Sequence, residues 1–171
     1  MLQTERVLLR PFGQADISPD YVSWLNDPRV VRYSNQRFVT HTQASCCSYL
    51  ESFADTPNLF LSVRMRAGDR AVGTMTAYRS LRHGTADMGI LIGHGAARGI
   101  GLGQEVWDLL LGWLVDQPDI RKVTAGAMRS NVAMIRIMER SGMSHEATRV
   151  KQELLDGVPE DLLYFAKFRD H

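Results

Sequence analysis

The sequence predicts a single α/β domain over residues 1–171, in which one mixed, mostly antiparallel sheet of about seven strands carries helices on both faces. Three observations lead to this prediction. Strand-like runs are interspersed with runs whose apolar residues recur every three or four positions. Gly- and Asp-containing turns separate neighbouring strand candidates. No repeat, linker or low-complexity tract divides the 171 residues, which are enough to enclose one core.

The N-terminal third is expected to contain one short strand followed by helices. Residues 6–10 alternate as a strand does, and residues 14–55 have a helical pattern that is interrupted at Asp27-Pro28. Thr40 or Thr42 could cap a second helix there. The face that the first helix would bury consists of Tyr21, Trp24 and Leu25.

The rest of the chain alternates between strand and helix patterns. The expected strands are residues 59–66, 71–79, 85–93, 122–127, 145–154 and 162–168. The expected helices run from Leu102 to about Asp116 and from an Asn131 cap to Arg140. A turn at Asp156-Gly157 would join the last two strands into a hairpin.

Composition excludes several classes of protein. Lys and Arg total 20 against 19 for Asp and Glu, which is too balanced for a protein whose main partner is a nucleic acid or an anionic membrane. No apolar run is long enough to span a membrane. The adjacent pair Cys46-Cys47 is badly placed for a disulfide, which favours a reducing, cytoplasmic location. A monomer or a homodimer would both be compatible with this composition.

The glycine-rich segment Arg98–Gly103 lies between a predicted strand and a predicted helix. Glycines at 99, 101 and 103 leave the helix N-terminus free of side chains, so its unpaired N–H groups can meet a phosphate. A nucleotide P-loop is excluded because no Gly-Lys pair occurs in the chain, and the dinucleotide pattern fails because Gln104 and Val106 stand where it needs glycine. The remaining alternative is that the glycines only tighten a turn.

Two motifs resemble the GNAT family of N-acetyltransferases. Arg98, Gly101 and Gly103 match the family's pyrophosphate-binding loop, and the run from Asn131 to Met143 is similar to its second characteristic helix. The run Trp24–Pro28 resembles the branch that acetylates ribosomal-protein N-termini, polyamines and amino sugars. The resemblance covers essentially the whole chain.

The resemblance implies acetyl-CoA as co-substrate and direct attack of an amine on the thioester. The backbone of residues 91–93 would pair with the pantetheine arm, the Arg98–Gly103 loop would hold the pyrophosphate, and Asn131 would reach the pantetheine or simply cap its helix. The implied cofactor-binding residues are Leu91, Ile92, Gly93, Arg98, Gly99, Ile100, Gly101, Leu102, Gly103 and Asn131. No metal is expected, because His41, His83 and His145 lack ligand spacing.

Two residues are candidates for the groups that handle protons. Many relatives place a tyrosine, as the acid for the leaving thiolate, where this chain has Met138. Asp87 occupies a carboxylate position of close relatives and is the first candidate for the base, and His94, just past the strand, is the second. A surface ion pair at Asp87 and a plain loop histidine at His94 are the alternatives.

The acceptor is expected to lie over residues 27–41. There Arg29, Arg32 and Arg37, with Tyr33, favour a small anionic amine such as a nucleotide-linked amino sugar. The same arginines could instead be solvated or contact CoA phosphates. A protein N-terminus is the main alternative acceptor, and Met138 leaves open a different class, an acyl-CoA-binding module without turnover.

Overall fold

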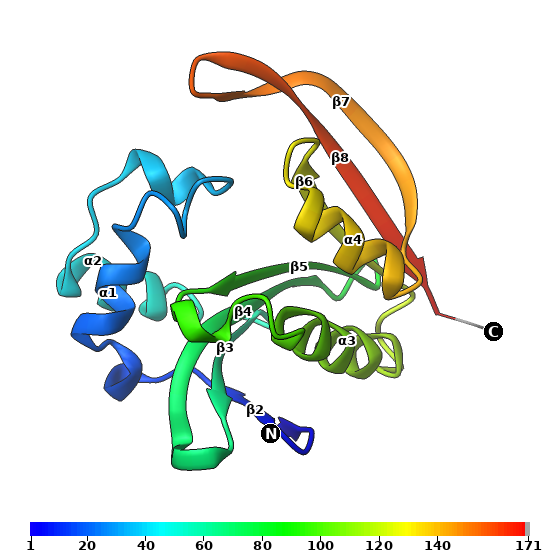
Figure 1. Cartoon of the computed structure of the whole chain (residues 1–171). Helices are drawn as coiled ribbons and strands as arrows, with labels where there is room; N and C mark the ends of the chain where they lie inside the picture. Colours follow the sequence, from blue (N-terminus) through cyan, green and yellow to red (C-terminus); the bar gives the residue numbers. More distant parts are fainter. Residues whose placement is uncertain (170–171) are drawn as a thin grey trace.

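A computed structural model describes residues 1–169 and contains one sheet of eight strands in the order β1-β2-β3-β4-β5-β6-β8-β7 (Figure 1). The strands are β1 Leu2–Gln3, β2 Val7–Pro11, β3 Leu59–Met65, β4 Arg70–Ser80, β5 Thr85–Ile92, β6 Lys122–Met128, β7 Ser144–Leu155 and β8 Val158–Phe168. The predicted α/β class is confirmed. The strand count was one too low, because β1 has only two residues and forms by pairing with Leu8 and Leu9.

Four α-helices flank the sheet: α1 Pro19–Leu25, α2 Gln43–Glu51, α3 Leu102–Val115 and α4 Val132–Arg140. Ser18, Thr42 and Asn131 cap α1, α2 and α4 by accepting a hydrogen bond from a backbone N–H of the first turn. The helical pattern expected over residues 14–55 resolves into α1, α2 and two short 3-10 turns, because α1 ends before Pro28. No helix within residues 1–169 has both the length and the apolar character needed to cross a membrane.

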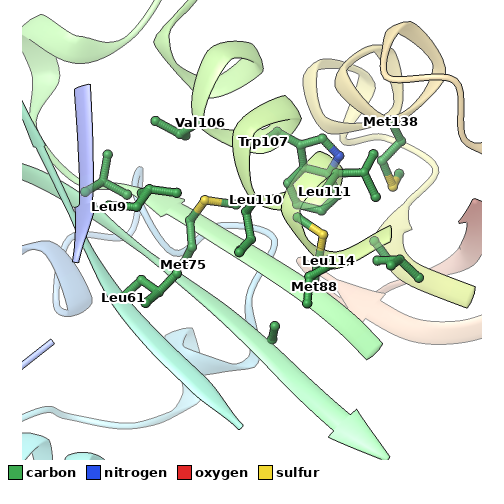
Figure 2. Close-up of a cluster of buried hydrophobic side chains, with 14 of the residues drawn as sticks. Leu9, Leu61, Met75, Met88, Val106, Trp107, Leu110, Leu111, Leu114 and Met138 are labelled. Atoms are coloured by element: carbon green, nitrogen blue, oxygen red, sulfur yellow. The ribbon is translucent and has the colours of Figure 1, made fainter. Parts of the chain in front are cut away.

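Two apolar clusters pack against opposite faces of the sheet. The larger one joins the strands to α3 and α4, with Trp107, Leu110 and Met138 completely buried (Figure 2). The smaller one, which packs α1 and α2 on the other face, contains Phe12, Tyr21, Trp24, Leu25, Cys46 and Phe60. The predicted helix face of Tyr21, Trp24 and Leu25 is therefore confirmed, as are the helices on both faces.

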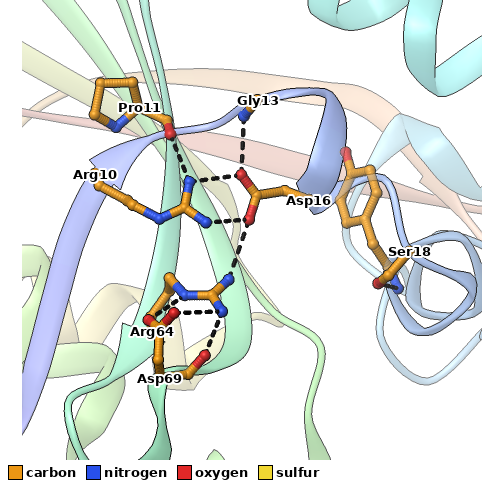
Figure 3. A network of polar contacts seen from close by, with 8 residues as sticks. Arg10, Pro11, Gly13, Asp16, Ser18, Arg64 and Asp69 are labelled. Atoms are coloured by element: carbon orange, nitrogen blue, oxygen red, sulfur yellow. Dashed lines mark hydrogen bonds and ion pairs between the residues drawn. The ribbon is translucent and has the colours of Figure 1, made fainter.

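A buried carboxylate fixes the chain where it leaves β2 for α1 (Figure 3). The Asp16 side chain is 2% exposed and accepts two hydrogen bonds of 2.8 Å from Arg10 and one of 3.1 Å from Arg64. The Gly13 N–H donates a fourth, of 2.9 Å. Because a charge of this kind is stable in the interior only when it is paired, this network anchors the turn before α1 to β2 and β3.

The strand pair β5–β6 is the only parallel pair among the described strands, and it is short. Its register covers three residue pairs, the last of which is Asp87 with Thr124. Beyond that pair both strands continue, to Ile92 and Met128, without pairing with each other. The sheet therefore opens between the carboxyl-terminal halves of two central strands, next to the N-termini of α3 and α4.

Candidate active site

The opening leaves backbone groups of β5 without a strand partner. The Gly93 N–H donates to the Val72 carbonyl at 3.0 Å, which shows that Gly93 faces β4. Because an antiparallel ladder alternates, Leu91 also faces β4, whereas Met88, Ile90 and Ile92 direct their N–H and C=O groups into the opening. Of the three backbone positions predicted to pair with pantetheine, Ile92 alone has this orientation, which it shares with Met88 and Ile90.

A cavity of about 650 Å³ occupies the opening and reaches both faces of the sheet. On one side it is lined by α1, α2 and the segment that joins them, including Tyr21, Tyr49 and His41. On the other side it is lined by α3 and α4, including Asn131, Met134 and Ile137. Ligands could therefore enter this cavity from both faces of the sheet and meet in its plane.

The predicted glycine loop forms the N-terminus of α3. Gly99 and Gly101 have φ values of +76° and +78°, and a Cβ at either position would meet nothing within 4 Å. Backbone conformation therefore explains these glycines, and they leave the helix end uncovered. The first intrahelical bond is donated by the Glu105 N–H to the Gly101 carbonyl, so the N–H groups of residues 102–104 remain available to an anion.

Two arginines hold this loop. The Arg98 side chain lines the cavity, and its Nε and Nη2 donate to the Ile92 carbonyl at 3.2 and 3.1 Å. Arg6 was missed by sequence reasoning: it donates to the Ile100 carbonyl at 3.4 Å and forms an ion pair with Glu105. Burial opposes the ionisation of Glu105, but hydrogen bonds from Thr4 and Arg6 outweigh it and lower the pKa of that carboxyl.

Gly93, at the end of β5, permits a close approach by α1. A Cβ at this position would lie 2.0 Å from Cδ2 and 2.2 Å from Cγ of Trp24. The Trp24 indole therefore rests directly on the Gly93 backbone, and only glycine leaves room for it. This contact fixes α1 against the end of the strand that borders the opening, which explains the tryptophan of the Trp24–Pro28 run.

Residues of α4 take different positions relative to the cavity. Asn131 lines it and also caps α4, with its Oδ1 accepting from the Met134 N–H at 3.3 Å. Met138, which stands where many relatives have tyrosine, is completely buried in the larger cluster and does not line the cavity. A side chain at position 138 would therefore point into the core in this chain.

The two predicted bases lie outside the cavity wall. Asp87 sits at the last β5–β6 pair, and its Oδ1 accepts a hydrogen bond of 2.7 Å from Thr124. Loss of solvent around the carboxyl raises the pKa of Asp87, and the Thr124 hydrogen bond acts against this. Asp87 also keeps exposed surface, so solvent screens part of the effect. His94 follows Gly93, and its N–H donates to the Val72 carbonyl at 3.1 Å.

Two of the four residues predicted at the acceptor site line the cavity, namely Arg29 and Tyr33. Arg29 forms an ion pair of 2.8 Å with Asp27, and hydrogen bonds from Arg29 lower the pKa of Asp27 to about 2. The Tyr33 hydroxyl donates to the Ser130 carbonyl at 3.2 Å, which connects the acceptor segment to the residues before α4.

Arg32 and Arg37 connect the same segment to the β7–β8 hairpin. Arg32 pairs with Asp156 at 3.0 Å, and Arg37 donates to the carbonyls of Ser34 and Leu154 at 2.7 and 2.8 Å. Neither residue lines the cavity. Much of the predicted basic cluster is thus used to hold the hairpin over the site.

Within residues 1–169, no group of three or more His, Cys, Asp and Glu side chains lies close enough together to hold a metal ion.

Residues 6–144 match the acetyltransferase (GNAT) domain family. Comparison with curated protein sequences finds no significant match. Among solved structures, the fold resembles spermidine N-acetyltransferase from Vibrio cholerae in complex with CoA and spermine, at a TM-score of 0.87 and 14% identity, with 97% of each chain covered.

Two further structures are similar at low identity. One is RimL, a ribosomal L7/L12 α-N-protein acetyltransferase in complex with coenzyme A, at a TM-score of 0.85 and 13% identity, covering 98% of this chain and 96% of that one. The other is the microcin C7 self-immunity acetyltransferase MccE in complex with acetyl-CoA and AMP, at 0.82 and 16%, covering 96% and 93%. At these identities the likeness concerns the fold. Because the family match spans most of the sequence, the chain belongs to the GNAT family of acetyl-CoA-dependent N-acetyltransferases.

Proposed function

We propose that this acetyltransferase binds acetyl-CoA and an amine together in the cavity between β5 and β6, where the amine attacks the thioester directly. The observation that carries this proposal is the opening itself. Unpaired backbone groups of β5 border a cavity that reaches both faces of the sheet, and the free N-terminus of α3 lies in the chain between Arg98 and Trp107, which both line that cavity.

The cofactor would occupy the side of the opening that borders α3 and α4. The free N–H groups of residues 102–104 suit a pyrophosphate, since they combine unsatisfied donors with the positive end of the α3 dipole. The Ile90 and Ile92 N–H groups could hydrogen-bond the pantetheine arm as an added strand does, and one of them could stabilise the thioester oxygen as it gains charge. Asn131 would contact the arm from α4.

The acceptor would occupy the side that borders α1 and α2. Among the described residues that line the cavity, none is Asp or Glu, and two are Arg29 and Arg98. Such a wall does not suit a polycation. Spermidine would require carboxylates that pair with its ammonium groups. We therefore propose a small anionic amine, with a nucleotide-linked amino sugar as its representative; the complex of MccE with AMP supports a nucleotide-sized acceptor in this fold.

A protein N-terminus is the second candidate acceptor. The structure of RimL favours it, since that enzyme modifies a protein α-amine within the same fold. Binding of acyl-CoA without turnover is a third, non-catalytic possibility. It is supported only by Met138, which cannot donate a proton to the leaving thiolate.

A thiol-release assay tests these alternatives. We expect acetyl-CoA to be consumed with a UDP-linked 4-amino sugar faster than with an alanine-ended peptide or with spermidine, and EDTA should have no effect. The Michaelis constant of the anionic acceptor should rise with ionic strength, because its attraction to Arg29 is screened. Thiol release with no member of the panel, despite bound acetyl-CoA, would favour the non-catalytic module; spermidine as best substrate would refute the anionic acceptor.

As a matched pair, Arg29→Gln and Arg70→Gln each remove one surface guanidinium. Arg70 is exposed at the start of β4 and does not line the cavity. We expect Arg29→Gln to raise the Michaelis constant of the acceptor and to leave that of acetyl-CoA unchanged. Arg70→Gln should change neither.

A further inference from the structure

We propose that His41 is the base that removes the proton from the acceptor amine. This inference rests on the proposed direct transfer, because that reaction needs an uncharged nitrogen. An alkylamine such as a lysine side chain has a pKa near 10, and an α-amine near 8, so most of the acceptor arrives protonated at neutral pH. The enzyme must provide a group that accepts this proton next to the thioester.

His41 is the one cavity-lining residue among those described that suits this role. The other ionisable side chains that line the cavity are Arg29, Arg98, Cys46, Tyr21, Tyr33 and Tyr49. Arginines stay protonated and cannot accept.

The tyrosines and the cysteine also keep their protons. Burial raises the pKa of both Tyr21 and Tyr49, and it raises the pKa of the Cys46 thiol. The Tyr33 hydroxyl already donates to a carbonyl. An imidazole, in contrast, carries a basic lone pair at neutral pH.

The chain fixes His41 at the cavity wall with a side chain from α1's C-terminus. Asn26 accepts a hydrogen bond of 2.8 Å from the His41 N–H and donates one of 2.9 Å to the His41 carbonyl. This clamp spans 15 positions of sequence and holds the segment between Phe38 and α2 against α1. The role of Asn26 in the Trp24–Pro28 run is therefore to hold the backbone of His41.

A carbonyl determines which ring nitrogen can accept the proton. The Nε2 atom of His41 lies 3.3 Å from the Gln36 carbonyl oxygen. Since a carbonyl oxygen only accepts hydrogen bonds, Nε2 carries the hydrogen and Nδ1 has the free lone pair in the neutral ring. The same carbonyl stabilises the imidazolium that forms when Nδ1 takes a proton.

The ionisable groups that line the cavity together with His41 belong to three parts of the chain. Arg29, which is paired with Asp27, follows α1; Arg98 follows β5; and the uncharged Cys46 and Tyr49 belong to α2. In the proposed step, the ammonium gives one proton to Nδ1, and the free amine then forms the C–N bond as the C–S bond of the thioester breaks. The second nitrogen proton ends on the CoA sulfur, and His41 releases its own proton to solvent.

The test compares the pH dependence of kcat/KM for the wild type and four variants, measured by thiol release with the fastest member of the acceptor panel. The variants are His41→Gln, Asp87→Asn and His94→Gln, and His83→Gln is the control in an exposed turn. We expect His41→Gln to lower kcat/KM by roughly 10²-fold or more and to abolish the limb that reports imidazole ionisation. The acetyl-CoA Kd should stay within about twofold of the wild-type value.

A structural role for His41 is separated from a catalytic one by His41→Ala. Added imidazole should restore part of its activity, with a dependence on the free-base form, and should not stimulate Asp87→Asn. Wild-type rates and an unchanged pH profile in His41→Gln would overturn the inference. Loss of this limb of the pH profile in Asp87→Asn or His94→Gln, and not in His41→Gln, would also overturn the inference. It would assign the base to the residue that was changed. If the wild-type enzyme releases no thiol with any amine, the proposed function itself has failed.

Discussion

The contact between Trp24 and Gly93 provides the sharpest test of how α1 is placed over the site. A Cβ at position 93 would lie 2.0 Å from the indole, whereas carbon atoms pack at about 3.5 Å, so Gly93→Ala must displace Trp24 by roughly 1.5 Å. Trp24 is 8% exposed and packs among other aromatic side chains, which leaves little room for that movement.

Overpacking of this kind typically costs about 1–3 kcal/mol. For a chain of 171 residues, this corresponds to a decrease in Tm of roughly 2–12 °C. Differential scanning calorimetry measures the decrease, and tryptophan fluorescence reports the displaced indole. Gly95→Ala is the matched control two residues away, since a Cβ there would meet nothing within 4 Å.

A double-mutant cycle with Trp24→Leu separates the contact from other effects. Because the smaller side chain leaves space for the added methyl group, Gly93→Ala should cost less in the Trp24→Leu background than in the wild type. If Gly93→Ala melts within 1 °C of Gly95→Ala, with unchanged fluorescence, our explanation of this glycine is wrong.

Two further predictions concern carboxylates that hold the framework of the site. Asp16→Asn removes the buried carboxylate that pairs with the partly exposed Arg10 and Arg64, of which Arg64 keeps Asp69, and should lower the free energy of unfolding by about 1–3 kcal/mol in urea titrations. The exposed Asp55→Asn should change it little, and equal values would contradict the role of the network. Because the folded-state pKa of Glu105 is lowered, its stabilisation is present above the unfolded value of 4.5 and is lost as the pH falls through the folded value. Glu105→Gln should therefore lower Tm at pH 7 and converge on the wild type once the pH has fallen below the lowered folded-state pKa, and a constant difference across that range would argue against the Arg6–Glu105 pair as its source.

Local sequence signals predicted most of the elements that surround the site. The expected strand 59–66 differs by one residue from β3, the expected strand 85–93 by one from β5, and the helix expected from Leu102 begins there as α3. These segments combine strong periodicity with clear turn residues or caps. The start of β8 at Val158 was missed because Pro159 and the charged residues after it hide the alternation.

The site itself was predictable only in part. The glycine loop was visible because positive φ values demand glycine at positions 99 and 101. The opening between β5 and β6 was not, since it depends on how far two strands distant in sequence stay paired. The same holds for the placement of His41, which follows from a hydrogen-bond clamp across 15 positions, and for Arg32 and Arg37, whose partners lie more than a hundred residues away.

We propose that the N-terminus of α3, at the edge of the opening, binds the pyrophosphate of acetyl-CoA. Titration calorimetry with Gly101→Val tests it most directly, because the branched side chain would stand in open space where phosphate oxygens should approach the backbone. Gly68→Val is the matched control: it has the same strained φ of +75° and open surroundings, but lies in the β3–β4 turn.

We expect the acetyl-CoA Kd to increase at least about tenfold in Gly101→Val, a loss of roughly 1.4 kcal/mol of binding free energy. It should be unchanged in Gly68→Val. Undiminished affinity in a folded Gly101→Val protein, or an equal loss in Gly68→Val, would contradict binding at this loop.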